Sequence, residues 1–114
     1  MRKPILNGLA DHLHVMRGLT LGAQVRTLAG NVTLVADSPT AQVMDPGGSA
    51  RTVTLPAEAD SEGLVFLIIN SADAAEVITV EDDGTTTQAT IAQDEAALLF
   101  CDGTSWHSLV GPNT

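Results

Sequence analysis

Two histidines separated by one residue, His12 and His14, are the one pair in this chain with the spacing of metal ligands. On a strand both imidazoles point to the same face, where they can share an ion. A complete site needs more ligands, normally a carboxylate soon after the pair and a further histidine. The segment Val15 to Leu19 has no carboxylate, and the remaining histidine is the distant His107. We therefore predict no metal site.

The acidic stretch Glu81-Asp82-Asp83-Gly84 offers oxygens of the kind that bind Ca²⁺. The glutamate that completes an EF-hand loop is missing, because Thr85 to Gln88 follow instead. Asp-Gly pairs commonly take positive φ in hairpin turns. We therefore interpret this stretch as a hairpin turn, with the positive φ at Asp83-Gly84.

The nearest nucleophile and base along the chain are Ser105 and His107. On a strand they lie on one side with Trp106 on the other, and no third group completes a triad. The single cysteine, Cys101, follows an apolar run and is predicted to be a packed thiol. Three nearby acids in a short polar segment indicate solvated charges and not an acid–base pair: Glu58, Asp60 and Glu62. We expect no enzyme activity and no cofactor.

The charges are segregated along the chain. All five basic residues lie in the first 51 positions with three acids, a balance of +2, whereas residues 52–114 hold eleven acids and no Lys or Arg, a balance of −11. Nucleic-acid binding depends on Lys and Arg at phosphates, so we exclude DNA and RNA as partners of the acidic part. The acids suit a basic surface or, alternatively, serve only solubility.

No apolar run reaches the ~18 residues of a membrane span. The longest, Leu64 to Ile69, has the length of a strand. No continuous apolar segment follows Met1-Arg2-Lys3, which predicts a chain without a secretory signal, made and kept in a cytoplasm.

Short alternating or apolar runs separated by turn residues predict an all-β domain over residues 31–114. An eight-stranded sandwich or jelly roll fits this pattern. The expected strands are Asn31 to Ala36, Ala41 to Asp45, Arg51 to Leu55, Leu64 to Asn70, Glu76 to Glu81, Gln88 to Ala92, Ala96 to Cys101 and Trp106 to Val110.

Residues 1–30 are predicted to form an N-terminal arm. The stretch Asn7 to Gly18 fits a short helix, while the alternation around His12 to Val15 fits an extended segment equally well. Apolar and basic side chains in this arm are candidate contacts with the body or a neighbouring molecule. They are Arg2, Lys3, Ile5, Leu6, Leu9, Leu13, Met16, Arg17 and Arg26.

The stretch Leu55-Pro56-Ala57, with small residues and Gly63 before an apolar strand that ends in Asn70, resembles a pattern of bacteriophage virion proteins. Similar features recur at residues 77–80 and 98–107, so the resemblance covers about residues 52 to 110. The same residues also have expected roles in folding. Pro56 ends one strand and Gly63 permits a bend. Asp102-Gly103 turns the last hairpin so that Trp106 covers one end of the core.

An arm joined to a compact sandwich is similar to the decoration, or cement, proteins of tailed-phage capsids. The resemblance implies a protein on the outer face of a capsid that binds the major capsid protein as a dimer or trimer and strengthens the shell. It would be made in the host cytoplasm and end in the virion, with no catalytic residue, membrane or nucleic acid involved. Phage tail-fibre β-domains share the same features, so a tail or fibre component that adheres to a host surface is the alternative.

Overall fold

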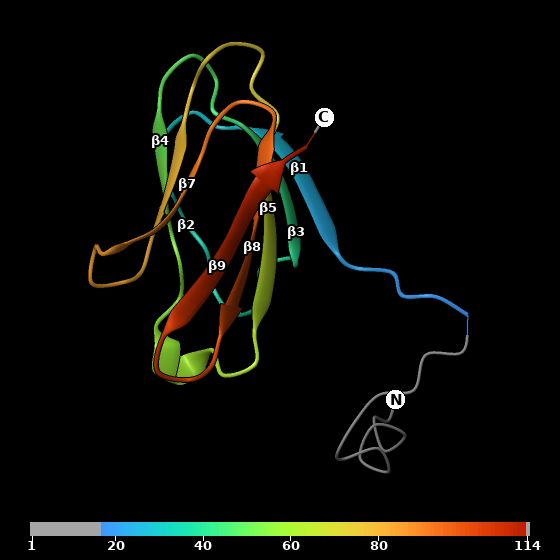
Figure 1. Cartoon of the computed structure of the whole chain (residues 1–114), viewed down its shortest axis with the longest axis vertical. Coiled ribbons are helices and arrows are strands. Elements are labelled where there is room, and N and C mark those ends of the chain that lie inside the picture. The colour runs from blue at the N-terminus through green and yellow to red at the C-terminus, as the bar shows by residue number, and fades with distance from the viewer. Residues whose placement is uncertain (1–16, 114) are drawn as a thin grey trace.

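Turn residues divide the described part of the chain into nine strands that form two facing mixed sheets (Figure 1). The computed structural model describes residues 17–113. The predicted all-β sandwich is confirmed. The strands are β1 (Ala23–Thr27), β2 (Val32–Thr33), β3 (Ala41–Asp45), β4 (Arg51–Thr54), β5 (Val65–Asn70), β6 (Ile78–Glu81), β7 (Thr87–Ile91), β8 (Glu95–Cys101) and β9 (Trp106–Pro112), with a short 3₁₀ helix, η1, at Glu58–Asp60.

The chain passes back and forth between the two sheets. Sheet A has the order β1-β3-β5-β8-β9, and sheet B has the order β2-β4-β6-β7. Strands β1, β3 and β5 are parallel, as are β2, β4 and β6, so the first six strands form three stacked coils. The last three strands run antiparallel to their neighbours and finish both sheets. A jelly roll is antiparallel, so the sandwich is the form observed.

The inward-facing side chains of both sheets make one apolar core. Alternation places Phe66 and Ile68 of β5 inside, and both are fully buried. Stacking of coils puts Val53 of β4 directly beside Val80 of β6. Trp106 packs on Phe66 with ring centroids 6.1 Å apart and is 5% exposed. The long apolar runs of the sequence therefore supply the centre of the sandwich.

A buried asparagine and a glycine shape the loops around this core. Asn70, 1% exposed at the end of β5, donates through Nδ2 to the carbonyl oxygens of Glu76 and Ile91, at 2.9 Å each. Its Oδ1 accepts the N–H of Ala72 at 3.0 Å. Gly47 has φ +81°, and a Cβ there would lie 2.4 Å from the carbonyl oxygen of Leu28. Asn70 thus joins the end of β5 to β7, and Gly47 lies close against the backbone that follows β1.

Seven of the eight expected strands match the observed ones to within about two residues at each end, while β2 is shorter than expected. The ninth strand is β1, which lies within the segment 1–30 assigned to the arm. Its residues Ala23–Thr27 alternate between exposed and half-buried, because β1 is an edge strand with one side against the core. The helix expected at Asn7 to Gly18 falls almost entirely outside the described residues.

The turn between β6 and β7 corrects one prediction. The residue with positive φ is Thr85, at 69°, whereas Gly84 is not among the positive-φ residues. The reason is the Asp82 side chain, whose Oδ1 accepts the N–H groups of Gly84 and Thr86 at 2.9 and 2.8 Å. These bonds wrap the backbone around the carboxylate and move the left-handed residue along by one or two positions.

No helix in the described part of the chain is long and apolar enough to cross a membrane.

Candidate functional site

Strand order follows sequence order in both sheets, so position along the chain becomes position across the molecule. The basic residues of the described chain, Arg17, Arg26 and Arg51, precede β1 or lie on β1 and β4. Eleven of the fourteen acids follow Arg51, toward the β7 and β9 side. The charge segregation of the sequence is therefore a charge gradient across the sandwich. We call the side formed by β1 and β2 the first edge.

Arg26 is the most unusual side chain of the first edge. Its Nη2 donates to Oε1 of the fully buried Gln42 at 3.3 Å, and Gln42 in turn donates to the carbonyl oxygen of Pro39 at 2.8 Å. The Arg26 Nε is buried without a hydrogen-bond partner, and the guanidinium makes no ion pair within residues 17–113. A buried N–H normally has a partner. Arg26 therefore has unused capacity to bind an acceptor.

Exposed apolar side chains also occur on and before the strands of the first edge. Leu19, Leu21, Val25 and Val35 are exposed by 67%, 45%, 76% and 57%. Arg17 is also exposed. Among the described strands, β1 and β2 each have a neighbour on one side only, so their outer backbone groups offer an edge for pairing with another chain. The first edge thus combines apolar contact area, unpaired strand edges and positive charge.

Of the candidate contacts from the sequence, Arg17 and Arg26 are described by the structure, and the others lie outside the described residues. They are Arg2, Lys3, Ile5, Leu6, Leu9, Leu13 and Met16, and the pair His12 and His14 lies there too. The chain enters the described structure at Arg17 and reaches sheet A through β1 (Figure 1). The predicted arm is therefore joined to the first edge.

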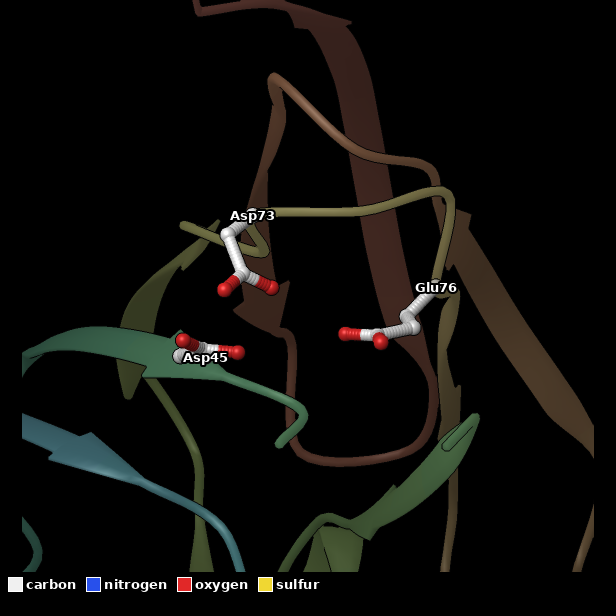
Figure 2. A group of neighbouring side chains, drawn as sticks. All are labelled: Asp45, Asp73 and Glu76. Carbon is white, nitrogen blue, oxygen red and sulfur yellow. The ribbon is translucent and has the colours of Figure 1, made fainter. Parts of the chain in front are cut away.

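Three carboxylates meet at the far end of β3, a group that sequence reasoning missed. Asp45 comes from β3, and Asp73 and Glu76 come from the loop between β5 and β6 (Figure 2). One oxygen from each lies within 4.8 Å of the others, and Glu76 Oε1 is buried without a hydrogen-bond partner in the described structure. Carboxylates are ligands for Ca²⁺ or Mg²⁺, but Ca²⁺ takes six to eight oxygens. The parallel pairing of β3 with β5 creates the group, and no local motif predicts it.

The turn after β8 is organised by Asp102. Its Oδ1 accepts the N–H groups of Thr104 and Ser105 at 2.8 and 2.7 Å, and its Oδ2 is 2.9 Å from Nε2 of His107. The hydrogen bond with His107, followed by the two backbone N–H groups, lowers the pKa of Asp102 from 3.8 to about 2. Gly103 has φ +96°. The bond between His107 and the Asp102 carboxylate thus stabilises the hairpin turn between β8 and β9.

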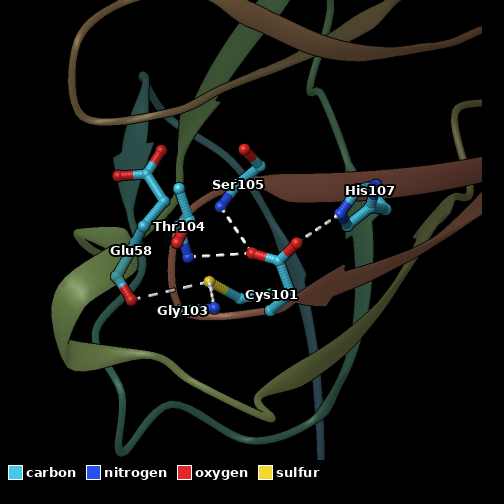
Figure 3. Close-up of polar contacts among 7 residues, drawn as sticks. Glu58, Cys101, Gly103, Thr104, Ser105 and His107 are labelled. Carbon is cyan, nitrogen blue, oxygen red and sulfur yellow. Dashed lines mark hydrogen bonds and ion pairs between the residues drawn. The ribbon is translucent and has the colours of Figure 1, made fainter.

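The remaining residues singled out in the sequence lie around this turn. Trp106 Nε1 donates to the carbonyl oxygen of Pro56 at 3.2 Å, joining the last hairpin to the segment after β4. Gly63 has φ +81°. Cys101 is free and fully buried, with Sγ 3.6 Å from the carbonyl oxygen of Glu58 (Figure 3). These contacts join the last hairpin to the segment between β4 and β5 and stabilise this end of the sandwich.

The carboxylate of Asp82, one of the calcium candidates, is engaged by its own turn. Besides the two backbone bonds to Oδ1, its Oδ2 accepts Nε2 of Gln88 at 3.2 Å. Both oxygens therefore have protein donors.

No protein-family model, curated protein or solved structure matches the chain.

Proposed function

We propose that this chain is a virion structural protein that binds the outer surface of a bacteriophage capsid and stabilises the shell by bridging subunits of the major capsid protein. The resemblance of residues 52 to 110 to phage virion modules supports the phage context. The observation that carries the proposal is the first edge, where strand edges, exposed apolar side chains and the basic residues Arg17 and Arg26 occur together.

Attachment through the first edge follows from the charge gradient. Arg17 precedes β1 and Arg26 lies on it, while the eleven acids that follow Arg51 lie on later strands and loops. A partner carboxylate would pair with the half-buried guanidinium of Arg26 through a charge-assisted hydrogen bond. The acidic side then faces solvent and keeps bound copies apart. Each copy adds a modest interface, and many copies together oppose expansion of the shell.

Binding to undecorated capsids tests the proposal. Electron microscopy should place the protein at regular positions on the capsid lattice, and co-sedimentation gives the affinity. Arg26→Gln should weaken binding by about tenfold, equal to about 1.4 kcal/mol. Arg51→Gln is the matched control, because it removes the same charge from a side chain already bonded to the carbonyl oxygen of Pro46. Equal loss in both variants would argue against a specific role for Arg26.

The location of the protein separates the two phage functions. Density on the tail or fibres, with none on the capsid, would replace the capsid proposal with the host-adhesion alternative. Deleting residues 1–16 tests the arm separately: unchanged capsid binding would remove its apolar and basic side chains from the attachment surface.

A further inference from the structure

A hollow of about 390 Å³ lies on the surface where β2 and β4 end. Two chain segments form its walls, and they are joined by the hydrogen bond from the N–H of Leu34 to the carbonyl oxygen of Thr54, at 2.8 Å. Val35 on one wall is 57% exposed. We call this hollow the apolar groove, because each wall supplies three consecutive apolar residues: Leu34, Val35, Ala36, Leu55, Pro56 and Ala57.

The charged residues described at the apolar groove are both acidic. Asp60 comes from η1 and Asp83 from the turn between β6 and β7, and both are exposed. Among the described residues that line the groove there is no Lys or Arg, and the other polar side chains are those of Thr33 and Thr54. The walls suit aliphatic side chains, whereas the two carboxylates favour a positively charged occupant.

The first six residues of the chain have this composition. Arg2 and Lys3 form the one place in the sequence where two basic residues are adjacent. The aliphatic residues Ile5 and Leu6 follow them directly after Pro4. A stretch with two cations beside two aliphatic side chains therefore matches the apolar groove in both charge and hydrophobicity.

The chain enters the sandwich at the end where the apolar groove lies. The carbonyl oxygen of Gly22, just before β1, accepts the N–H of Ala41 at 2.9 Å, and a Cβ on Gly22 would lie 3.8 Å from that of Pro39. Pro39 belongs to the segment between β2 and β3, and residues 34–36 of the same segment form one wall of the groove. The entry point and the groove are thus neighbours.

The arm is long enough to return to this point. Residues 17–22 are exposed and lead away from the sandwich (Figure 1). At ~3.3 Å per residue they extend by about 20 Å at most, whereas residues 7–16 can span about 33 Å. The difference covers the three residues from Pro39 to Ala36, which extend over about 10 Å at most. Residues 2–6 can therefore reach the apolar groove of their own chain.

We propose that residues 2–6 dock in the apolar groove of their own chain. The side chains of Ile5 and Leu6 lie against the walls and supply most of the affinity, because ion pairs on an exposed surface contribute little. The two basic residues lie near the carboxylates and set the direction of the segment. The body of a second copy is a poor occupant, because it is acidic like the groove. Docking covers Val35 but leaves Arg26 of the first edge accessible, so it does not require capsid binding.

Paramagnetic relaxation enhancement in NMR spectra of the full chain tests the proposal. A nitroxide attached at Asn7→Cys lies next to the docking residues, and the native Cys101 is fully buried, which protects it from labelling. The amide signals of Ala36, Ala57 and Asp83 should lose most of their intensity. The signal of Asp94 should keep its intensity, because Asp94 follows β7, which runs away from the turn that holds Asp83.

Substitutions on both sides of the contact test its chemistry. Ile5→Ser should lower the ratio of docked to free arm at least tenfold, because it removes a buried aliphatic side chain. Asp60→Asn combined with Asp83→Asn should lower the ratio about fivefold. Asp94→Asn is the matched control, since it removes the same charge from another exposed position, and it should leave the ratio unchanged. The replaced carboxylates are exposed, and urea unfolding should confirm that each variant is folded as stably as the wild type.

Three results would overturn the proposal. One is full intensity of the groove signals in the labelled chain. Another is a loss of intensity that neither Ile5→Ser nor the paired aspartate substitutions reduce. The third comes from mixing nitroxide-labelled chains with isotope-labelled chains that have no nitroxide: if groove signals weaken in the mixture, the arm binds a neighbouring copy. A free arm on a chain that still binds capsids would refute the docking while leaving the proposed function standing.

Discussion

Replacing Asn70 by leucine should destabilise the sandwich strongly, although the two side chains are similar in size. The substitution removes three hydrogen bonds, two from Nδ2 to the carbonyl oxygens of Glu76 and Ile91 and one from the N–H of Ala72 to Oδ1. Asn70 is 1% exposed, so water does not readily replace it. At about 1 kcal/mol per bond, the loss is about 3 kcal/mol. This is a large part of the ~5–15 kcal/mol that stabilises a domain.

Urea unfolding monitored by fluorescence measures this loss. Trp106 is the one tryptophan and stacks on Phe66 in the core, so its emission reports the native packing. With a slope of about 2 kcal/mol per molar urea, 3 kcal/mol lowers the midpoint by about 1.5 M. Asn31→Leu is the control, because Asn31 Oδ1 accepts a single N–H, that of Thr52, at an exposed position. A shift below about 0.5 M for Asn70→Leu, or equal shifts in both variants, would refute the reasoning.

Three further predictions concern the turns and the carboxylate group. Gly47→Ala should lower the free energy of unfolding by about 2 kcal/mol or more, because the new Cβ would meet a backbone oxygen at a position with positive φ. Gly48→Ala, at a position with positive φ but open space, should lower it by about 1 kcal/mol. Urea unfolding measures both changes. Glu76→Gln should raise the free energy of unfolding by about 0.5–1 kcal/mol at low salt, because it removes repulsion among three carboxylates. Screening in 1 M NaCl should largely abolish this gain. Carbon NMR should give Asp102 a pKa of about 2, and His107→Ala should raise it toward 3.8.

The sign of the Asp102 contribution follows from that lowered pKa. The unfolded chain binds the proton at higher pH than the folded chain, so the stabilising effect is complete above about pH 3.8 and is lost as the pH falls toward 2. A titration midpoint near 3.8 in the folded wild type would contradict the bond to His107. Equal costs for Gly47→Ala and Gly48→Ala would contradict the close approach to the Leu28 carbonyl. A salt-independent effect of Glu76→Gln would contradict repulsion as its cause.

Local sequence pattern was sufficient to predict most strands. The buried strand β5 and the hairpin β8–β9 have apolar alternation and turn residues such as Asp102 and Gly103, which act over a few residues. The strand β1 was assigned to the arm because Ala23–Thr27 is half polar and gains its structure from parallel pairing with β3. A pairing between residues far apart in sequence leaves no local signal.

The charge segregation, the all-β class and the turn positions were determined by the amino-acid sequence itself, because composition and short-range periodicity encode them. Tertiary structure alone decided that strand order follows sequence order, which turns the charge segregation into a gradient across the molecule. It also decided that Asp45 meets Asp73 and Glu76, that Arg26 Nε is buried without a partner among residues 17–113, and that apolar side chains are exposed on the outer surface of sheet A. Each of these depends on which strands become neighbours, and that choice is made by the packing of the whole core.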